Sequence, residues 1–247
     1  MILLGDYHTH TTFSHGKGSV LQNALVAKEK GLKQIAITDH GFSHIMYGLK
    51  PNKMDKLKQE IQLAKQQTGV DILLGIEANF ISLDGDIDLT EEQLKMFDII
   101  LAGFHYAGRP KSVKDFFGFF VPNYSPFNPT QNQIRKNTEA VMRALDRYPI
   151  DVVTHPGYAM PVDFKRLSNH CKQTNTYFEM NGKRINFSQD DLLQMQQDKV
   201  KLIINSDAHS PEKVGECNHA LNLVTKLNIN EQLLVNVNKL PNFKNKG

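Results

Sequence analysis

The sequence predicts one α/β domain over residues 1–247, a distorted (β/α)7 TIM-like barrel, and three observations support this fold class. Short apolar runs alternate with amphipathic stretches, the pattern of parallel strands joined by helices. Seven such units fit within a length that one α/β barrel commonly fills. Six apolar runs end beside a histidine, aspartate or glutamate, and barrels collect functional side chains at the carboxyl ends of their strands. A doubly wound sheet would bring six strand ends to one point less readily.

The expected elements follow one another at regular intervals. Strands are expected at the apolar runs 2–4, 34–38, 72–76, 99–104, 151–154, 176–180 and 201–206. Helices are expected at 19–30, 53–67, 131–147, 164–173 and 210–225, with shorter helices that begin at Thr90 and Ser188. Gly31 and Gly69 close the first two helices as C-caps. The polar end, residues 239–247, is expected to be frayed.

Two stretches interrupt this order. Residues 82–88 carry three alternating aspartates, but an EF-hand would need glycine at Leu89 and glutamate at Lys95, so a solvated turn is expected. Residues 106–130 form a long loop in which Arg109 and two lysines accompany several phenylalanines. Because this loop starts directly after His105, it is expected to be either a lid or a segment that packs down or meets a partner subunit.

Charge and composition limit the classes of function. The 29 basic and 26 acidic residues leave a net charge of +3, too small for the footprint of a nucleic-acid-binding protein. No apolar run approaches the roughly 18 residues of a membrane span, and no basic-then-apolar leader is visible. Cys171 and Cys217 fit neither a zinc knuckle nor a disulfide framework, so both are expected to be buried and inert. These features predict a cytoplasmic protein without membrane contact, and they leave its oligomeric state open.

Candidate metal ligands gather near the expected strand ends. His8 and His10 point to the same side of an extended chain and can chelate one ion, and His15 follows closely. The other candidates are His40, Glu77, His105, His155, Asp207 and His209. Nine ligands exceed the needs of one ion and suffice for three, and imidazoles with a few carboxylates favour zinc, manganese or iron. The remaining histidines, His44, His170 and His219, are expected on the surface, although His44 lies on a loop that can reach the site.

Together these blocks resemble the signature of the PHP (polymerase and histidinol phosphatase) superfamily. The blocks are His8-Thr9-His10, Thr38-Asp39-His40, Glu77, His105, His155-Pro156 and Asp207-Ala208-His209. The resemblance implies a seven-stranded barrel with three divalent metal ions. It places His8, His10, Glu77 and Asp207 on the first ion, Glu77 with His105 and His155 on the second, and His15, His40 and His209 on the third. Asp39 would orient an imidazole from outside the ligand set.

The resemblance is strongest to the stand-alone phosphatases, which implies hydrolysis of a small phosphomonoester, with histidinol phosphate as one candidate. Clustered divalent ions neutralise phosphate oxygens and activate water, so an activated hydroxide is expected to attack phosphorus. The expected catalytic residues are Glu77, His105 and Asp207, with Arg109 to neutralise the phosphate. Lys183 and Arg184 are second choices for that role.

Two alternatives stay open on the sequence. A nuclease or phosphodiesterase with the same metals would need a basic groove lined by aromatic residues, and residues 109–127 contain both types. The near-neutral net charge argues against nucleic acid as the substrate. A metal-binding or regulatory module without turnover would have lost ligands, whereas the expected set is complete.

Overall fold

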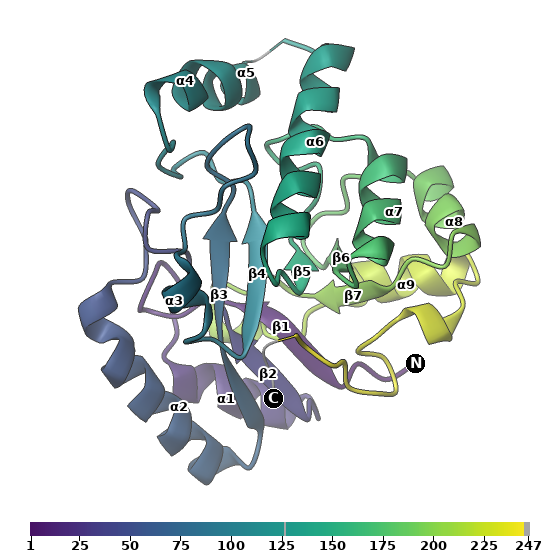
Figure 1. The fold of residues 1–247 in the computed structure, drawn as a ribbon. Helices are drawn as coiled ribbons and strands as arrows, with labels where there is room; N and C mark the ends of the chain where they lie inside the picture. The colour runs from purple at the N-terminus through teal and green to yellow at the C-terminus, as the bar shows by residue number, and fades with distance from the viewer. Residues whose placement is uncertain (126, 245–247) are drawn as a thin grey trace.

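A single sheet of parallel strands forms the centre of the molecule. The computed structural model describes residues 1–125 and 127–244. The strands lie in the order of the sequence: β1 Gly5–Thr9, β2 Gln34–Ile37, β3 Asp71–Asn79, β4 Ile99–Gly103, β5 Val152–Val153, β6 Tyr177–Asn181 and β7 Leu202–Asn205 (Figure 1). Every neighbouring pair is parallel, which requires the chain to cross back outside the sheet between strands.

The sheet closes where β1 meets β7. The amide of Ala208 donates to the carbonyl of His8 at 3.1 Å, and the amide of His10 donates to the carbonyl of Ala208 at 2.8 Å. Toward the start of β1 the Asn236 side chain links the two strands, because it bonds to the carbonyl of Gly5 and to both backbone groups of Ile204. The expected distorted seven-stranded barrel is confirmed.

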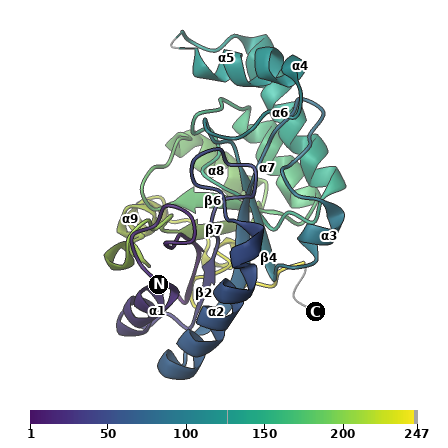
Figure 2. The ribbon, with the colours of Figure 1, turned by 90° about the vertical axis from the view of Figure 1, so that its left-hand side faces the viewer.

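Helices cover the outside of this barrel (Figures 1 and 2). They are α1 Val20–Glu29, α2 Met54–Thr68, α3 Glu91–Leu94, α4 Val113–Asp115, α5 Val121–Tyr124, α6 Gln131–Arg147, α7 Phe164–Gln173, α8 Gln189–Gln197 and α9 Asn218–Lys226. Capping boxes at Ser19, Thr90 and Ser188 fix the starts of α1, α3 and α8. No helix in the described parts of the chain has the length and apolar character needed to cross a bilayer.

The inside of the barrel changes from apolar to polar along the strands. Leu73, Gly75 and Glu77 alternate along β3 and therefore share one face. Leu73 packs in a buried apolar cluster inside the barrel, whereas Glu77 is fully buried toward the carboxyl end of β3. The same alternation places Glu179 two residues after Tyr177 on β6. An apolar base thus supports a polar layer at the carboxyl ends of the strands.

Two expected boundaries are wrong. The first strand is Gly5–Thr9 rather than residues 2–4, because Leu3 and Leu4 pair with the returning C-terminal segment at Val237 and Asn236. The helix expected at 210–225 is split into a 3-10 turn at Pro211–Lys213 and α9. Gly215 separates them with a φ of 69°, a left-handed conformation that ends a helix.

Residues 113–124, within the segment expected as a loop at 106–130, are helical. They form α4, a π-helical turn at Phe116–Phe120 and α5, which lie beyond the end of the sheet in both views (Figures 1 and 2). Phe119 and Phe120 are buried against Phe104, with ring centroids 5.3 and 5.1 Å from it. Phe117 and Phe127 are 65% and 81% exposed, so only part of the aromatic group packs the segment down.

Two further expectations change for polar segments. Asp86 and Asp88 in the 82–88 turn are buried rather than solvated, because Asp86 pairs with Lys111 and Arg147 and Asp88 accepts hydrogen bonds from Asn79. The end of the chain is ordered through residue 244. Phe243 packs edge-on against Tyr7 with centroids 4.9 Å apart, and Lys244 bonds to the start of β5 at Asp151. The expectation for residues 245–247 lies outside the described residues.

Replacement of Asn236 by alanine should destabilise the closure of the barrel. The change leaves the buried amide of Ile204 and the carbonyls of Gly5 and Ile204 without their side-chain partner, so the free energy of unfolding should fall by about 2–3 kcal/mol. Urea denaturation measures the change. The exposed Asn132→Ala in α6 is the control and should shift it by less than about 0.5 kcal/mol. Equal effects of the two variants would contradict the closing role.

Candidate metal centre

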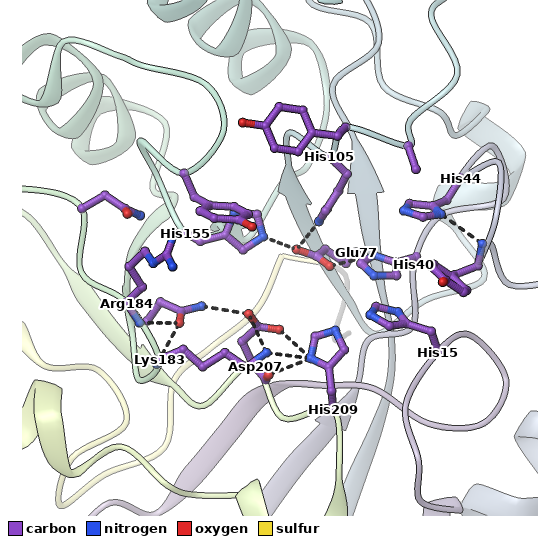
Figure 3. A pocket seen from close by; sticks show the side chains of 16 residues that line it. His15, His40, His44, Glu77, His105, His155, Lys183, Arg184, Asp207 and His209 are labelled. Carbon is purple, nitrogen blue, oxygen red and sulfur yellow. Dashed lines mark hydrogen bonds and ion pairs between the residues drawn. The ribbon is translucent and has the colours of Figure 1, made fainter. Parts of the chain in front are cut away.

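The nine ligands expected from the sequence all lie at the carboxyl end of the barrel, and Figure 3 labels all of them except His8 and His10. His8 is in β1, Glu77 is in β3, and His10, His40, His105, His155, Asp207 and His209 follow the strands directly, while His15 comes from the loop after β1. Parallel strands open at one end of the barrel, so side chains far apart in sequence converge there.

Glu77 lies at the centre of the cluster and is completely buried. Its two oxygens face ring nitrogens of His155 at 2.9 Å, His40 at 3.0 Å, His8 and His105 at 3.2 Å, and His10 at 3.6 Å. Burial raises the pKa of Glu77, but the charges of His105 and His8 outweigh this effect and hold the pKa well below its usual value. Glu77 is therefore a carboxylate surrounded by imidazoles.

Asp207 supplies the second carboxylate. Its Oδ1 lies 3.3 Å from His209 Nδ1, 3.4 Å from His10 Nε2 and 3.6 Å from His8 Nε2. Asp207 has a φ of 52° and His155 a φ of 29°, both in the left-handed region that strains residues other than glycine. Such strain persists where the surroundings hold a residue in place for function.

Four overlapping trios of ligand atoms lie within 4.8 Å of one another. They are His8, Glu77 and His155; His40, Glu77 and His105; His8, His10 and Asp207; and His10, His40 and His209. His15 borders the last trio, since its ring stacks on His40 with centroids 4.8 Å apart and lies 4.2 Å from His209. The His10 ring adjoins the same two residues, with centroids 4.6 Å from His40 and 4.3 Å from His209, so His10 lies beside His15 at this end of the cluster.

The donor atoms fit divalent cations. Among the described residues, buried side-chain atoms without a hydrogen-bond partner concentrate here: His8 Nε2, both ring nitrogens of His10, His15 Nδ1, His40 Nδ1 and Glu77 Oε2. His40 Nδ1 and Glu77 Oε2 approach to 3.0 Å without the geometry of a hydrogen bond. Native proteins rarely leave buried polar atoms unpaired, and a shared cation would satisfy these atoms together.

The protonation of His10, His15 and His40 agrees with this fit. Burial lowers the pKa of His10 to about 3, and burial together with the charge of His209 lowers the pKa of His15 to about 4. Burial also holds the pKa of His40 well below its usual value. These rings are neutral near pH 7, and only a neutral imidazole offers the lone pair that a metal requires.

Glu179 is a central residue that the sequence analysis missed. It is fully buried on β6. Its two oxygens accept hydrogen bonds from His8 Nδ1 at 2.9 Å, Asn205 Nδ2 at 3.0 Å, Asn181 Nδ2 at 3.2 Å and the His155 amide at 2.5 Å. Its hydrogen bond to Nδ1 turns Nε2 of His8 toward Glu77. An acidic residue flanked by Phe178 and Met180 in an expected strand was the available signal.

Three other expectations change with the geometry. Asp39 accepts hydrogen bonds from Thr11 and Ser14 and so fixes the loop after β1 rather than an imidazole. His44 is not a surface residue, because it is 8% exposed and stacks on His40 with centroids 4.6 Å apart. Arg109 is exposed and does not line the pocket over the cluster.

His170 pairs with Asp146 and His219 is exposed, as expected for residues outside the site.

A pocket of about 410 Å³ opens over this cluster (Figure 3). Its floor consists of the histidines, Glu77 and Asp207, and its wall contains Tyr47, Tyr106, Tyr158, Asn186, Lys183 and Arg184. This volume suits a small molecule. Lys183 and Arg184, the second choices for neutralising the phosphate, thus line the pocket, whereas Arg109 does not.

A parallel barrel whose strand ends bring imidazoles and carboxylates together under a small pocket belongs to the class of metal-binding α/β barrels. The model of the PHP domain matches residues 6–221, and the chain belongs to this family.

The relatives and the solved structures agree with that assignment. A probable phosphatase of Caldanaerobacter subterraneus is 29% identical, over 95% of this chain and 87% of the relative, and one of Thermoanaerobacter sp. is 30% identical, over 96% and 91%. The crystal structure of histidinol phosphate phosphatase from Lactococcus lactis, complexed with zinc, L-histidinol and phosphate, has a TM-score of 0.67 at 15% identity and covers 100% of this chain and 98% of that chain. The similarity to this structure concerns the fold.

Replacement of Glu179 by glutamine should weaken metal binding without removing a ligand. The amide would direct its NH2 group at donors that now share a carboxylate, so His8 would lose its orientation. We expect the affinity for Zn²⁺ or Mn²⁺ to fall roughly 10–100-fold, measured by competition with a chromogenic chelator. The exposed Glu92→Gln in α3 serves as the control. Unchanged affinity in Glu179→Gln would contradict this supporting role.

Proposed function

We propose that the protein is a metal-dependent phosphatase that hydrolyses a small phosphomonoester, with residues 1–247 acting as one catalytic domain. The observation that carries the proposal is the buried carboxylate of Glu77 among five histidines, with unpaired donor atoms around it. Family membership and the probable phosphatases among the relatives support the same reaction class. The buried free thiols Cys171 and Cys217 are compatible with a reducing, cytoplasmic setting.

The donor set supports sites for three divalent ions, of zinc, manganese or iron. His8, His10, Glu77 and Asp207 would hold the first ion, Glu77 with His105 and His155 the second, and His15, His40 and His209 the third. His10 adjoins the third set as well as the first. Ions bound there would neutralise phosphate oxygens and make water nucleophilic near neutral pH. The imidazole-rich set favours these metals over calcium or magnesium.

The side chains of the pocket would divide the remaining work. Lys183 Nζ lies 3.3 Å from Asp207 Oδ2 and 2.8 Å from His209 Nδ1, which would place its charge beside a phosphate held above the ligands. Glu179 and Asn79 would orient His8 and His105, because each bonds to the ring nitrogen that faces away from Glu77. Tyr47, Tyr106 and Tyr158 line the pocket and would limit the size of the substrate.

Metal content and ester hydrolysis test this function together. Protein purified without added metal should carry two or three divalent equivalents by elemental analysis and should hydrolyse p-nitrophenyl phosphate. Chelation should abolish turnover, and Mn²⁺ or Zn²⁺ should restore it. Glu77→Gln removes the shared carboxylate charge, so it should lower both the metal content and, by at least about a hundredfold, the monoesterase activity.

Two controls make the outcome decisive. Glu92→Gln should retain full metal content and activity, because Glu92 is exposed and distant from the cluster. Bis(p-nitrophenyl) phosphate should be the poorer substrate, and a preference for it would favour the nuclease or phosphodiesterase alternative. Metal-loaded protein with no turnover of either ester would contradict the enzymatic function and support a regulatory module.

A further inference from the structure

The pocket wall has a one-sided charge. Among the described residues that line the pocket, the carboxylates are Glu77 and Asp207, and both belong to the candidate metal centre. Two cations, Lys183 and Arg184, lie on the wall formed after β6, and the rest of the wall is uncharged. A positive group on a substrate would therefore find no carboxylate of its own in this wall.

Lys183 and Arg184 serve different parts of the pocket. Figure 3 shows the Lys183 side chain extending toward Asp207 and His209, in agreement with its distances to both. The guanidinium of Arg184 instead lies over the ring of Tyr158, with Cζ 5.2 Å from the ring centroid. Tyr158 in turn packs against the ring of His155, with centroids 5.6 Å apart. One cation thus borders the Asp207 side of the floor and the other borders the His155 side.

The turn that carries both cations is fixed to the floor of the site. Asn181 Oδ1 accepts from the amides of Lys183 and Arg184 at 3.0 and 3.3 Å, while its Nδ2 donates to Glu179 and Asp207. No carboxylate in the described parts of the chain forms an ion pair with Arg184. The guanidinium is therefore positioned by its backbone and by Tyr158, and its charge is available to an incoming group.

We infer that the alcohol part of the substrate carries a second anionic group, a carboxylate or another phosphate, which Arg184 binds beside Tyr158. This inference rests on the proposed phosphatase function and specifies its substrate class. Lys183 would face the phosphate that is cleaved, and Arg184 would face the group that is retained on the alcohol. Alcohols that carry an ammonium, histidinol included, meet Arg184 without a compensating carboxylate and should be poor substrates.

A set of para-substituted phenyl phosphates tests this selectivity on metal-loaded protein. The set comprises 4-carboxyphenyl phosphate, phenyl phosphate and 4-(aminomethyl)phenyl phosphate, with benzene-1,4-diyl bisphosphate to compare a second phosphate with the carboxylate. We expect Arg184→Gln to lower the ratio of kcat/KM for the carboxylated ester to kcat/KM for phenyl phosphate by about tenfold, the loss of one charge-assisted interaction. Arg184→Glu should reverse the order of the carboxylated and aminomethyl esters. The exposed Arg109→Gln, outside the pocket, is the control.

Binding supplies a readout that is independent of turnover. Calorimetric titration with 4-carboxyphenylphosphonate and phenylphosphonate, neither of which is hydrolysed at the P–C bond, should show tighter binding of the carboxylated compound in the wild type and equal binding in Arg184→Gln. If the esters are hydrolysed but Arg184→Gln affects all of them equally, or the aminomethyl ester is preferred, the inference is wrong and the phosphatase function stands. If no ester is hydrolysed, the phosphatase function fails, and the phosphonate titration alone then decides whether Arg184 selects an anionic group.

Discussion

The structure depends on one buried carboxylate that touches five imidazoles. Glu77 is inaccessible to solvent, so its charge cannot be hydrated and must be balanced inside the protein. Several of the surrounding rings are neutral near pH 7, because burial lowers the pKa of His10 and His40. Bound divalent cations would therefore complete the balance of the negative charge on Glu77. The closed sheet, the strained backbone at His155 and Asp207 and the surrounding hydrogen bonds hold these side chains together.

The barrel meets this need by separating support from chemistry along each strand. On β3 the period of two puts Leu73 into the apolar base and Glu77 into the polar layer above it, so one face contributes to both. The closure between β1 and β7 fixes His10 through the hydrogen bond of its amide to Ala208. Residues far apart in sequence, such as His8 and Asp207, thereby meet in one site at the carboxyl ends of the paired strands.

The sequence was most informative where the chemistry repeats at strand ends. The parallel barrel and the meeting of the nine candidate ligands at one end of it could be predicted because six of the seven apolar runs stop beside a histidine or an acid. Glu179 was missed because it lies inside its strand and contacts the site through His8. His44 was expected on the surface, on a loop that can reach the site, because only the fold stacks its ring on His40. The ordered C-terminal segment, the helical turns at 113–124 and the position of Arg109 depend on tertiary contacts that no local pattern encodes.

The division of charge within the pocket connects the fold to the choice of substrate. The floor combines carboxylates and imidazoles, which are suited to metal ions, whereas the charged side chains of the wall after β6 are the cations Lys183 and Arg184. Both layers meet at Asn181, whose oxygen fixes the turn with Lys183 and Arg184 and whose nitrogen bonds to Glu179 and Asp207. In the proposed enzyme, Asn181 would therefore hold the metal ligands and the cations of the wall in a fixed relation, because one amide side chain bonds to both.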